Sequence, residues 1–396
     1  MKIRKMVAPI TVLQRLPVAF GLAALTTVTA CYGVTLTANA AIGPPAASMP
    51  AIRAGALSSA VGPAGPLRGA KYVIRIVKMS GFRASVAMGA GGRRWVGVAL
   101  RGNKHVYGHA VLGDAAGGVL DINPKGCRWS LAYGVCKHMV VGEGDVPWGR
   151  AGAFLWRGRG WIPVRLGPVG AWLSQANALA GGQEVGCVMF RKGGCDRAAL
   201  WRGSPASFVD LNPKGYKCSV AAATDGRQVV GWGRLPHQRT HALLWLKSGS
   251  KIVDLNPAGF VRSEAHGVAG GVVVGYGETR LNVVHAICWH GRSLRPLDIN
   301  PAGDAQSKCF AIRGSWLVGC VMPKKGGHWH AAVWAQGAAK AVDMQHFLPG
   351  RFSSSCAYAV TVSGDVYGTA VVRKVHLNAA IEWQPVRSTR KGGIHR

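Results

Sequence analysis

Short apolar runs separated by glycine- or proline-bearing turns recur along residues 71–383 in units of about 44 residues. The clearest unit reads Ser-Val-Ala at 219–221, Val-Val-Gly at 229–231, His-Ala-Leu-Leu-Trp at 241–245 and Val-Asp-Leu at 253–255. β-Branched and aromatic residues favour strands, while proline and glycine supply the φ angles that tight turns need. Each unit therefore predicts four short strands, which we name a, b, c and d in chain order.

Seven copies of this unit align along the chain. The position of Trp245 recurs at residues 113, 156, 201, 245, 289, 334 and 383, and that of Asp254 at 121, 165, 210, 254, 298 and 343. Gly113 and Arg165 break these two series. A four-stranded sheet of this size cannot bury both faces alone, whereas sheets stacked radially can. We therefore predict an all-β fold, a seven-bladed β-propeller.

The two ends of the repeat region predict how the ring closes. The last unit has strands a to c, ending at Trp383, but no obvious strand d. Residues 72–77, Tyr-Val-Ile-Arg-Ile-Val, form a good strand with no a, b and c before it, so we expect them to supply the missing strand. This gives a propeller domain over 71–383, preceded by an Ala/Pro/Gly-rich linker at 41–70 and followed by a basic tail at 384–396.

The repeated His-Ala-x-x-Trp, Asp-Leu-Asn-Pro and Val-Val-Gly runs resemble the bacterial extracellular HAF-type repeat over about residues 80–383. The sequence departs from that repeat at the third position of its His-Ala-Phe core. Only Phe154 keeps the phenylalanine, and there Gly152 stands in place of the histidine. The resemblance implies export and a repeat fold, and no particular activity, because the family is defined by its repeat.

Residues 1–40 predict an export signal, because a segment with four basic residues precedes an uncharged, largely apolar run. Ala38-Asn39-Ala40 fits a signal-peptidase site. Alternatively, Val28-Thr29-Ala30-Cys31 resembles a lipobox, in which Cys31 would carry a lipid, or the segment is an uncleaved anchor. All three place the folded part outside the cytoplasm: in the periplasm, attached to the outer membrane, or secreted.

Ten cysteines suit an oxidising compartment. Nine remain if Cys31 leaves with the signal or carries lipid, so at least one is free or pairs between chains. The pairs close in sequence are Cys127/Cys136, Cys187/Cys195 and Cys309/Cys320. Alternatively, several of them are small buried apolar residues.

Ser, His, Trp and Asp recur together at fixed spacing, which at first suggests a hydrolytic triad. The clearest set is Ser219, His241, Trp245, Asp254, Ser263, His285, Trp289, Asp298, Ser307, His330, Trp334 and Asp343. A catalytic set would occur once, so we interpret these residues as a structural framework. They resemble the residues of WD-repeat propellers, which implies that buried hydrogen bonds tie the strands of each blade together.

Other sites for chemistry are weakly indicated, so we predict no catalytic residue, no metal and no cofactor. His328 and His330 form the closest histidine pair, but no third ligand stands near them. Glu143 and Asp145 are interpreted as a solvated ion-pair cluster in a loop beside Arg150. An enzyme is therefore not favoured. A hydrolase or lyase with its site in the central channel is one alternative, and a structural or assembly protein of the envelope is another.

The chain carries a net charge of +32, and residues 41–396 still carry +28. Because successive strands of a blade are antiparallel, loops b–c and d–a emerge on one face. The b–c loops contribute Arg101, Lys104, Arg150, Arg191, Lys192, Arg234, Arg239, Arg280, Lys324, Lys325, Arg373 and Lys374. The d–a loops add Lys125, Arg128, Lys214, Lys217, Arg262 and Lys308. This pattern predicts a cationic face.

The opposite face is also basic, since the c–d loops carry Arg157, Arg159, Arg202, Lys247, Lys251, Arg292 and Arg295. Two interpretations therefore stay open: a functional cationic face, or a generally basic surface. The function we expect is a non-catalytic, monomeric binding scaffold for an acidic partner outside the cytoplasm. Candidate partners are lipopolysaccharide, acidic polysaccharide, extracellular DNA and an acidic protein.

Overall fold

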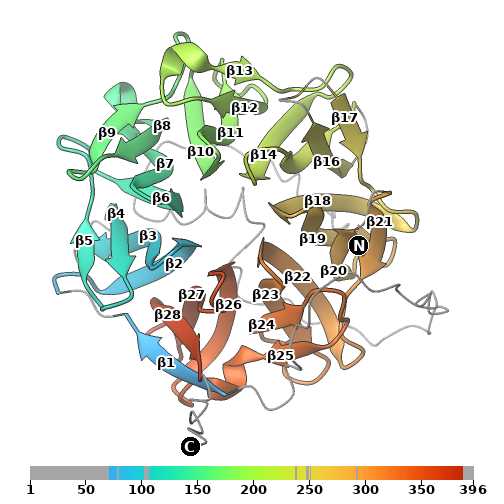
Figure 1. The fold of residues 1–396 in the computed structure, drawn as a ribbon. Helices are drawn as coiled ribbons and strands as arrows, with labels where there is room; N and C mark the ends of the chain where they lie inside the picture. The colour runs from blue at the N-terminus through green and yellow to red at the C-terminus, as the bar shows by residue number, and fades with distance from the viewer. Residues whose placement is uncertain are drawn as a thin grey trace, which may run out of the picture.

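Seven antiparallel sheets of four strands each surround a central axis, and Figure 1 shows the molecule viewed along that axis. The computed structural model describes residues 71–77, 80–101, 107–236, 239–246, 249, 251–290 and 293–386. The predicted all-β fold, a seven-bladed β-propeller, is confirmed. In the first six blades the strands follow one another from the axis outward in the order a, b, c and d.

Each of these six blades is a continuous stretch of the chain. Blade 1 consists of β2 (Ala84–Gly91), β3 (Arg94–Arg101), β4 (Tyr107–Asp114) and β5 (Val119–Asp121). Blade 2 consists of β6 (Ser130–Cys136), β7 (Met139–Val146), β8 (Arg150–Arg157) and β9 (Ile162–Arg165). Blade 3 consists of β10 (Leu173–Ala180), β11 (Gln183–Met189), β12 (Arg197–Trp201) and β13 (Val209–Asp210).

The second half of the ring repeats this arrangement. Blade 4 consists of β14 (Cys218–Thr224), β15 (Val229–Arg234), β16 (Thr240–Leu246) and β17 (Lys251–Asp254). Blade 5 consists of β18 (Phe260–Ala269), β19 (Val272–Thr279), β20 (Val284–His290) and β21 (Arg295–Asp298). Blade 6 consists of β22 (Asp304–Arg313), β23 (Trp316–Pro323), β24 (His330–Ala335) and β25 (Ala341–Asp343). Short 3-10 helices lie in three connections: η1 (Pro147–Gly149), η2 (Pro205–Ser207) and η4 (Met344–Phe347).

Blade 7 closes the ring with a strand from the start of the propeller. Its inner strands are β26 (Phe352–Val360), β27 (Val366–Val372) and β28 (Leu377–Pro385), and β1 (Tyr72–Ile76) is its outermost strand. β1 pairs antiparallel with β28, from Tyr72 opposite Pro385 to Ile76 opposite Ile381. The predicted closure by an N-terminal strand is therefore confirmed. The blade extends slightly beyond the predicted end at residue 383. The Val386 amide still donates a hydrogen bond to the Lys71 carbonyl over 2.8 Å.

The glycine of the Val-Val-Gly run is explained by a bulge in every inner strand. In blade 4 the register of strands a and b shifts between Ala221 and Ala223. A Cβ atom placed on Gly231 would then lie 2.0 Å from the Val220 carbonyl oxygen. Gly275 in blade 5 meets the Glu264 carbonyl in the same way, at 1.9 Å. Only glycine permits this close approach, so the run is a structural requirement of the blade.

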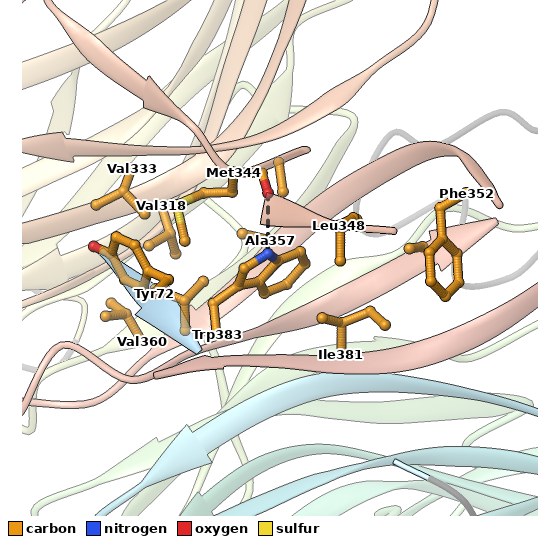
Figure 2. Close-up of a cluster of buried hydrophobic side chains, with 13 residues drawn as sticks. Tyr72, Val318, Val333, Met344, Leu348, Phe352, Ala357, Val360, Ile381 and Trp383 are labelled. Carbon is orange, nitrogen blue, oxygen red and sulfur yellow. Dashed lines mark hydrogen bonds between the residues drawn. The ribbon is translucent and has the colours of Figure 1, made fainter. Parts of the chain in front are cut away.

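Each blade buries one tryptophan that packs against its neighbours. In blade 7 this residue is Trp383, and Figure 2 shows it beside Tyr72 of β1, with Val318 and Val333 of blade 6 in the same cluster. Blade 1 has Gly113 where the repeat has tryptophan, and Trp95 on the paired strand takes its place. A Cβ atom on Gly113 would lie 2.1 Å from the Trp95 ring. The two substitutions therefore compensate each other.

Cys195 and Cys218 form a disulfide that joins blade 3 to blade 4. None of the three pairs close in sequence forms a disulfide, because Cys195 bonds to Cys218 and the other five cysteines of these pairs are free. The buried ones among the free cysteines are Cys187, Cys288, Cys309, Cys320 and Cys356. They pack as small apolar residues, which was the alternative interpretation.

The predictions made for residues 1–70, including lipidation at Cys31, lie outside the described residues, as does the basic tail from 387 onward. Within the part of the chain that the structure describes, no helix is long and apolar enough to cross a membrane.

Candidate functional site

The propeller has two faces, and we name the one that carries the b–c and d–a loops the upper face. The predicted b–c cations lie there, and those with exposed side chains are Arg101, Arg191, Lys192, Arg234, Arg239, Arg280, Lys324, Lys325, Arg373 and Lys374. Lys104 lies outside the described residues. Arg150 differs from the others, because it is half-buried and its guanidinium lies 3.7 Å from the centre of the Trp172 ring.

Two of the cations predicted for the d–a loops lie within strands. Lys308 belongs to β22 and packs over the rings of Tyr276 and Trp329, so it is not a surface loop residue. Arg262 belongs to β18, and its Nε lies 3.6 Å from the Glu278 carboxylate. Lys125, Arg128, Lys214 and Lys217 are exposed on the upper face, and Arg128 forms an ion pair with Asp145 over 2.7 Å.

The interpretation of Glu143 and Asp145 as a solvated loop cluster beside Arg150 is wrong. Both lie in β7 and are buried, and Glu143 accepts a hydrogen bond from the Tyr133 hydroxyl over 2.6 Å. Burial is the main cause that raises the pKa of Glu143 to about 7. Both acids belong to the strand before the loop, in which every residue from Val140 to Asp145 is buried.

The repeated serines join neighbouring blades at all seven interfaces. Ser219 at the start of blade 4 accepts a hydrogen bond from the Ala198 amide of blade 3 over 3.0 Å. Its hydroxyl donates to Asn212 Oδ1 over 2.6 Å, and the Asn212 amide donates to the Tyr216 carbonyl over 3.0 Å. The asparagine of the Asn-Pro turn is thus a central framework residue, although the sequence pattern indicated only a turn. In blade 7 the equivalent serine is Ser355.

The repeated tryptophans also bind across blades. Trp245 Nε1 donates to the Leu211 carbonyl of blade 3 over 2.8 Å, and Trp289 Nε1 donates to the Leu255 carbonyl of blade 4 over 2.8 Å. The expectation that the whole set ties the strands of one blade together is therefore wrong for Ser and Trp. They hold the ring together between its blades.

The His–Asp pairs lie within one blade, as expected, but at its solvent edge. His241 Nδ1 and Asp254 Oδ2 are 2.8 Å apart, and their side chains are 20% and 42% exposed. The pairs of His285 with Asp298 and of His330 with Asp343 have the same geometry. The expected burial of these pairs is wrong, because strands c and d meet solvent at their upper ends. Water can replace either partner there.

The framework serines are buried, whereas the His–Asp pairs are partly exposed to solvent, and this difference in burial predicts unequal effects of two substitutions in blade 4. Ser219→Ala is expected to lower the free energy of unfolding by about 2–3 kcal/mol, because it leaves the buried Ala198 amide without an acceptor. Asp254→Ala is expected to lower it by less than about 1 kcal/mol, because its partner remains hydrated. Urea denaturation of both variants measures the difference, and equal losses would contradict this division of roles.

The central channel contains polar residues that the repeat pattern did not reveal. A cavity of about 140 Å³ lies on the axis, and the inner strands that Figure 1 shows around the opening line it. Glu264 of β18 accepts hydrogen bonds from Tyr276, over 2.5 Å, and from the ring of buried His266, over 3.1 Å. Burial opposes ionisation of Glu264, but the bonds from His266 and Tyr276 and the charge of Lys308 outweigh it and lower its pKa.

The hydrogen bonds that join Glu264, His266 and Tyr276 favour a structural role for this axial cluster. One carboxylate oxygen of Glu264 accepts both bonds. The residue that follows the framework serine is Glu264 in blade 5, but it is Val86, Leu131 or Val220 in three other blades. The change from an apolar to an acidic residue at this position is the sequence signal that could have indicated the cluster. Among the described residues, no group of three His, Cys, Asp or Glu side chains could hold a metal ion.

Comparisons with known proteins support the fold. No family model matches the chain, and no curated protein matches it. The HAF-type resemblance therefore stays a prediction. Among solved structures, a puromycin hydrolase mutant complexed with PGG is similar with a TM-score of 0.56 and 15% identity, over 78% of this chain and 52% of that one. A second puromycin hydrolase structure has a TM-score of 0.52 and 15% identity, over 73% and 50%.

The β-propeller domain of the Trilobed protease from Pyrococcus furiosus is similar with a TM-score of 0.50 and 8% identity, over 76% of this chain and 96% of that domain. The chain spans about half the length of the puromycin hydrolases that it matches. Identities this low show the fold alone. The comparisons thus agree with the strand topology, and this chain is a seven-bladed β-propeller.

Proposed function

We propose that this propeller is a non-catalytic scaffold that binds an acidic partner in the cell envelope or outside the cell through its upper face. The observation that carries the proposal is that every blade places at least one arginine or lysine at its b–c connection, and that most of these side chains are exposed. A regular ring of cations suits a polymer with repeated negative charges, because many weak contacts add along its length.

Several of the loop cations are available for such contacts. Arg191, Lys192, Lys325 and Lys374 are exposed, and none of them makes a side-chain hydrogen bond or ion pair with another described residue. Lipopolysaccharide, acidic polysaccharide and extracellular DNA all present closely spaced phosphates or carboxylates. Export, inferred from residues 1–40, would bring the protein into contact with these polymers, and sequencing the mature N-terminus from cell fractions tests that part of the proposal.

Charge reversal on the upper face is expected to weaken polymer binding. A variant with Arg191, Lys192, Lys325 and Lys374 changed to Glu should bind heparin, DNA or lipopolysaccharide at least about tenfold more weakly at low salt. It should also show a flatter dependence of the binding constant on salt, because fewer counterions are released. Titration of fluorescent polymer at several salt concentrations measures both quantities.

The matched control reverses four exposed cations of the a–b and c–d turns on the opposite face: Arg93, Arg159, Arg227 and Lys251. It changes the net charge by the same amount. It should retain most of the affinity and the salt slope of the natural protein. If the two variants lose equal affinity, only the overall charge attracts the polymer, and the proposed binding face is wrong.

A further inference from the structure

The interface between blades 2 and 3 departs from the repeat at three framework positions on the upper face. Gly152 stands where blades 1, 4, 5 and 6 have the histidine of the His–Asp pair, and Arg165 stands in place of the aspartate. Gly167 replaces the asparagine that accepts the serine hydroxyl. The side chains that fill this corner in the other blades are therefore missing together.

The consequence is a serine whose hydroxyl proton has lost its usual acceptor. Ser174 is buried and accepts a hydrogen bond from the Ala153 amide over 2.9 Å, as the other framework serines do from theirs. At five of the other interfaces the hydroxyl donates to an amide oxygen 2.6–2.7 Å away, on Asn123, Asn212, Asn256, Asn300 or Gln345. Ser174 donates to no described residue. The nearby Trp201 Nε1 is also buried without a partner.

A cavity of about 240 Å³ occupies this corner. Gly152, Gly167 and Ser174 line it, and Pro147 and Pro168 add apolar surface. Arg150 and Arg165 supply the charged groups, and no carboxylate is present among the described residues of its lining. The cavity is thus small, positively charged and partly apolar.

Arg150 is held in position within this wall. Its guanidinium lies over the Trp172 ring, 3.7 Å from the centre, which limits its freedom before any ligand arrives. Its Nε atom is buried and has no hydrogen-bond partner among the residues that the structure describes. Buried donors almost always have an acceptor. A guanidinium nitrogen without an acceptor and a serine hydroxyl that donates to no described residue, on one cavity, indicate a place for an acceptor from outside the chain.

We propose that this pocket binds a single oxyanion group, a carboxylate or a phosphate monoester, carried on a molecule about the size of one sugar unit. Guanidinium groups match both anions with paired, charge-assisted hydrogen bonds. The volume lies below the range of about 300–1,000 Å³ typical of drug-sized ligands, which limits the ligand to a small one. A monomeric anion can fill this pocket. Its binding can therefore be measured separately from the binding of a polymer to the loop cations.

The test uses D-glucuronate, glucose 6-phosphate and glucose as probes in isothermal titration calorimetry with the full-length protein. We expect one site for at least one of the two anions and no binding of glucose. Arg165→Gln and Gly167→Asn should each weaken that binding at least about tenfold. Arg165 is exposed, so its replacement should leave the fold intact. Gly167→Asn places a side chain in the cavity, and because its Cβ atom would lie 2.7 Å from Ser174 Oγ, thermal unfolding of this variant checks that it still folds.

The matched control for charge is Arg159→Gln, an exposed cation of the opposite face in blade 2 that does not line the pocket. It should bind the anion as the natural protein does. Absence of saturable binding by either anion would overturn the proposal, as would equal losses in Arg165→Gln and Arg159→Gln. Because the probes are monomers, failure here is distinguishable from failure of polymer binding, which charge reversal of the loop cations tests separately. The preferred anion identifies the chemistry of the natural ligand.

Discussion

Deletion of residues 72–76 is expected to lower the free energy of unfolding by at least about 5 kcal/mol, a large share of the stability of a typical domain. These residues form β1, the outermost strand of blade 7, and five of their positions pair with β28. Tyr72 is buried in the cluster that surrounds Trp383, as Figure 2 shows. Its loss removes apolar burial and leaves an unpaired strand edge in the closing blade. Thermal unfolding followed by circular dichroism measures the change.

The control for this deletion removes five residues from the predicted linker at 41–70, which should leave the melting temperature unchanged. If the truncated protein cannot be purified folded, a synthetic peptide of residues 71–77 added during refolding provides a second measurement. Binding of the peptide to the open blade should raise the melting temperature with peptide concentration, by mass action. A truncated protein as stable as the natural one would contradict closure by β1.

The fold was predictable because each unit carries the same information seven times. A weak strand pattern becomes strong when its turns, its tryptophans and its Val-Val-Gly runs recur at one spacing. The missing strand d was predictable for the same reason. The last unit lacks a strand d, and the first strand of the propeller has no a, b and c before it, so the two ends complete one blade. The exchange of Gly113 and Trp95 was not predictable, because it depends on which residues of strands b and c stand opposite each other.

The site was less predictable, because its features depend on where a residue lies in the ring. Glu264, His266 and Lys308 are ordinary variable positions in an alignment of units. Glu264 and His266 stand two residues apart in β18, whereas Lys308 of the next blade approaches Glu264 only because the inner strands surround one axis. Asp254 repeats as regularly as Trp245, and yet one is at the solvent edge and the other is fully buried. Repetition indicates a shared role, but the burial of each position within the blade decides how much its residue contributes to the free energy of unfolding.

Arg75→Met is expected to lower the free energy of unfolding by about 3–5 kcal/mol, the cost typical of leaving one partner of a buried ion pair alone. Arg75 stands opposite Glu382 in the pairing of β1 with β28, and it forms a salt bridge with that fully buried carboxylate. Its other nitrogens donate to the carbonyls of Asp114 and Ala115 in blade 1, each over 3.2 Å. One guanidinium therefore joins the closing strand, the last blade and the first blade. Chemical denaturation of the variant measures the loss.

A double variant separates the charge of Glu382 from the packing of the closing strand. Removing both charges with Arg75→Met and Glu382→Met should recover much of the lost stability, because no buried carboxylate is then left unpaired. Tyr367 would still lose its acceptor, since its hydroxyl donates to Glu382 over 2.7 Å, so recovery should be incomplete by about 1 kcal/mol. Arg93→Met, at an exposed turn of the opposite face, controls for loss of one positive charge and should be neutral. If the double variant were as unstable as Arg75→Met alone, the contacts with blade 1 would carry the stabilisation, and the ion pair would contribute little to closure.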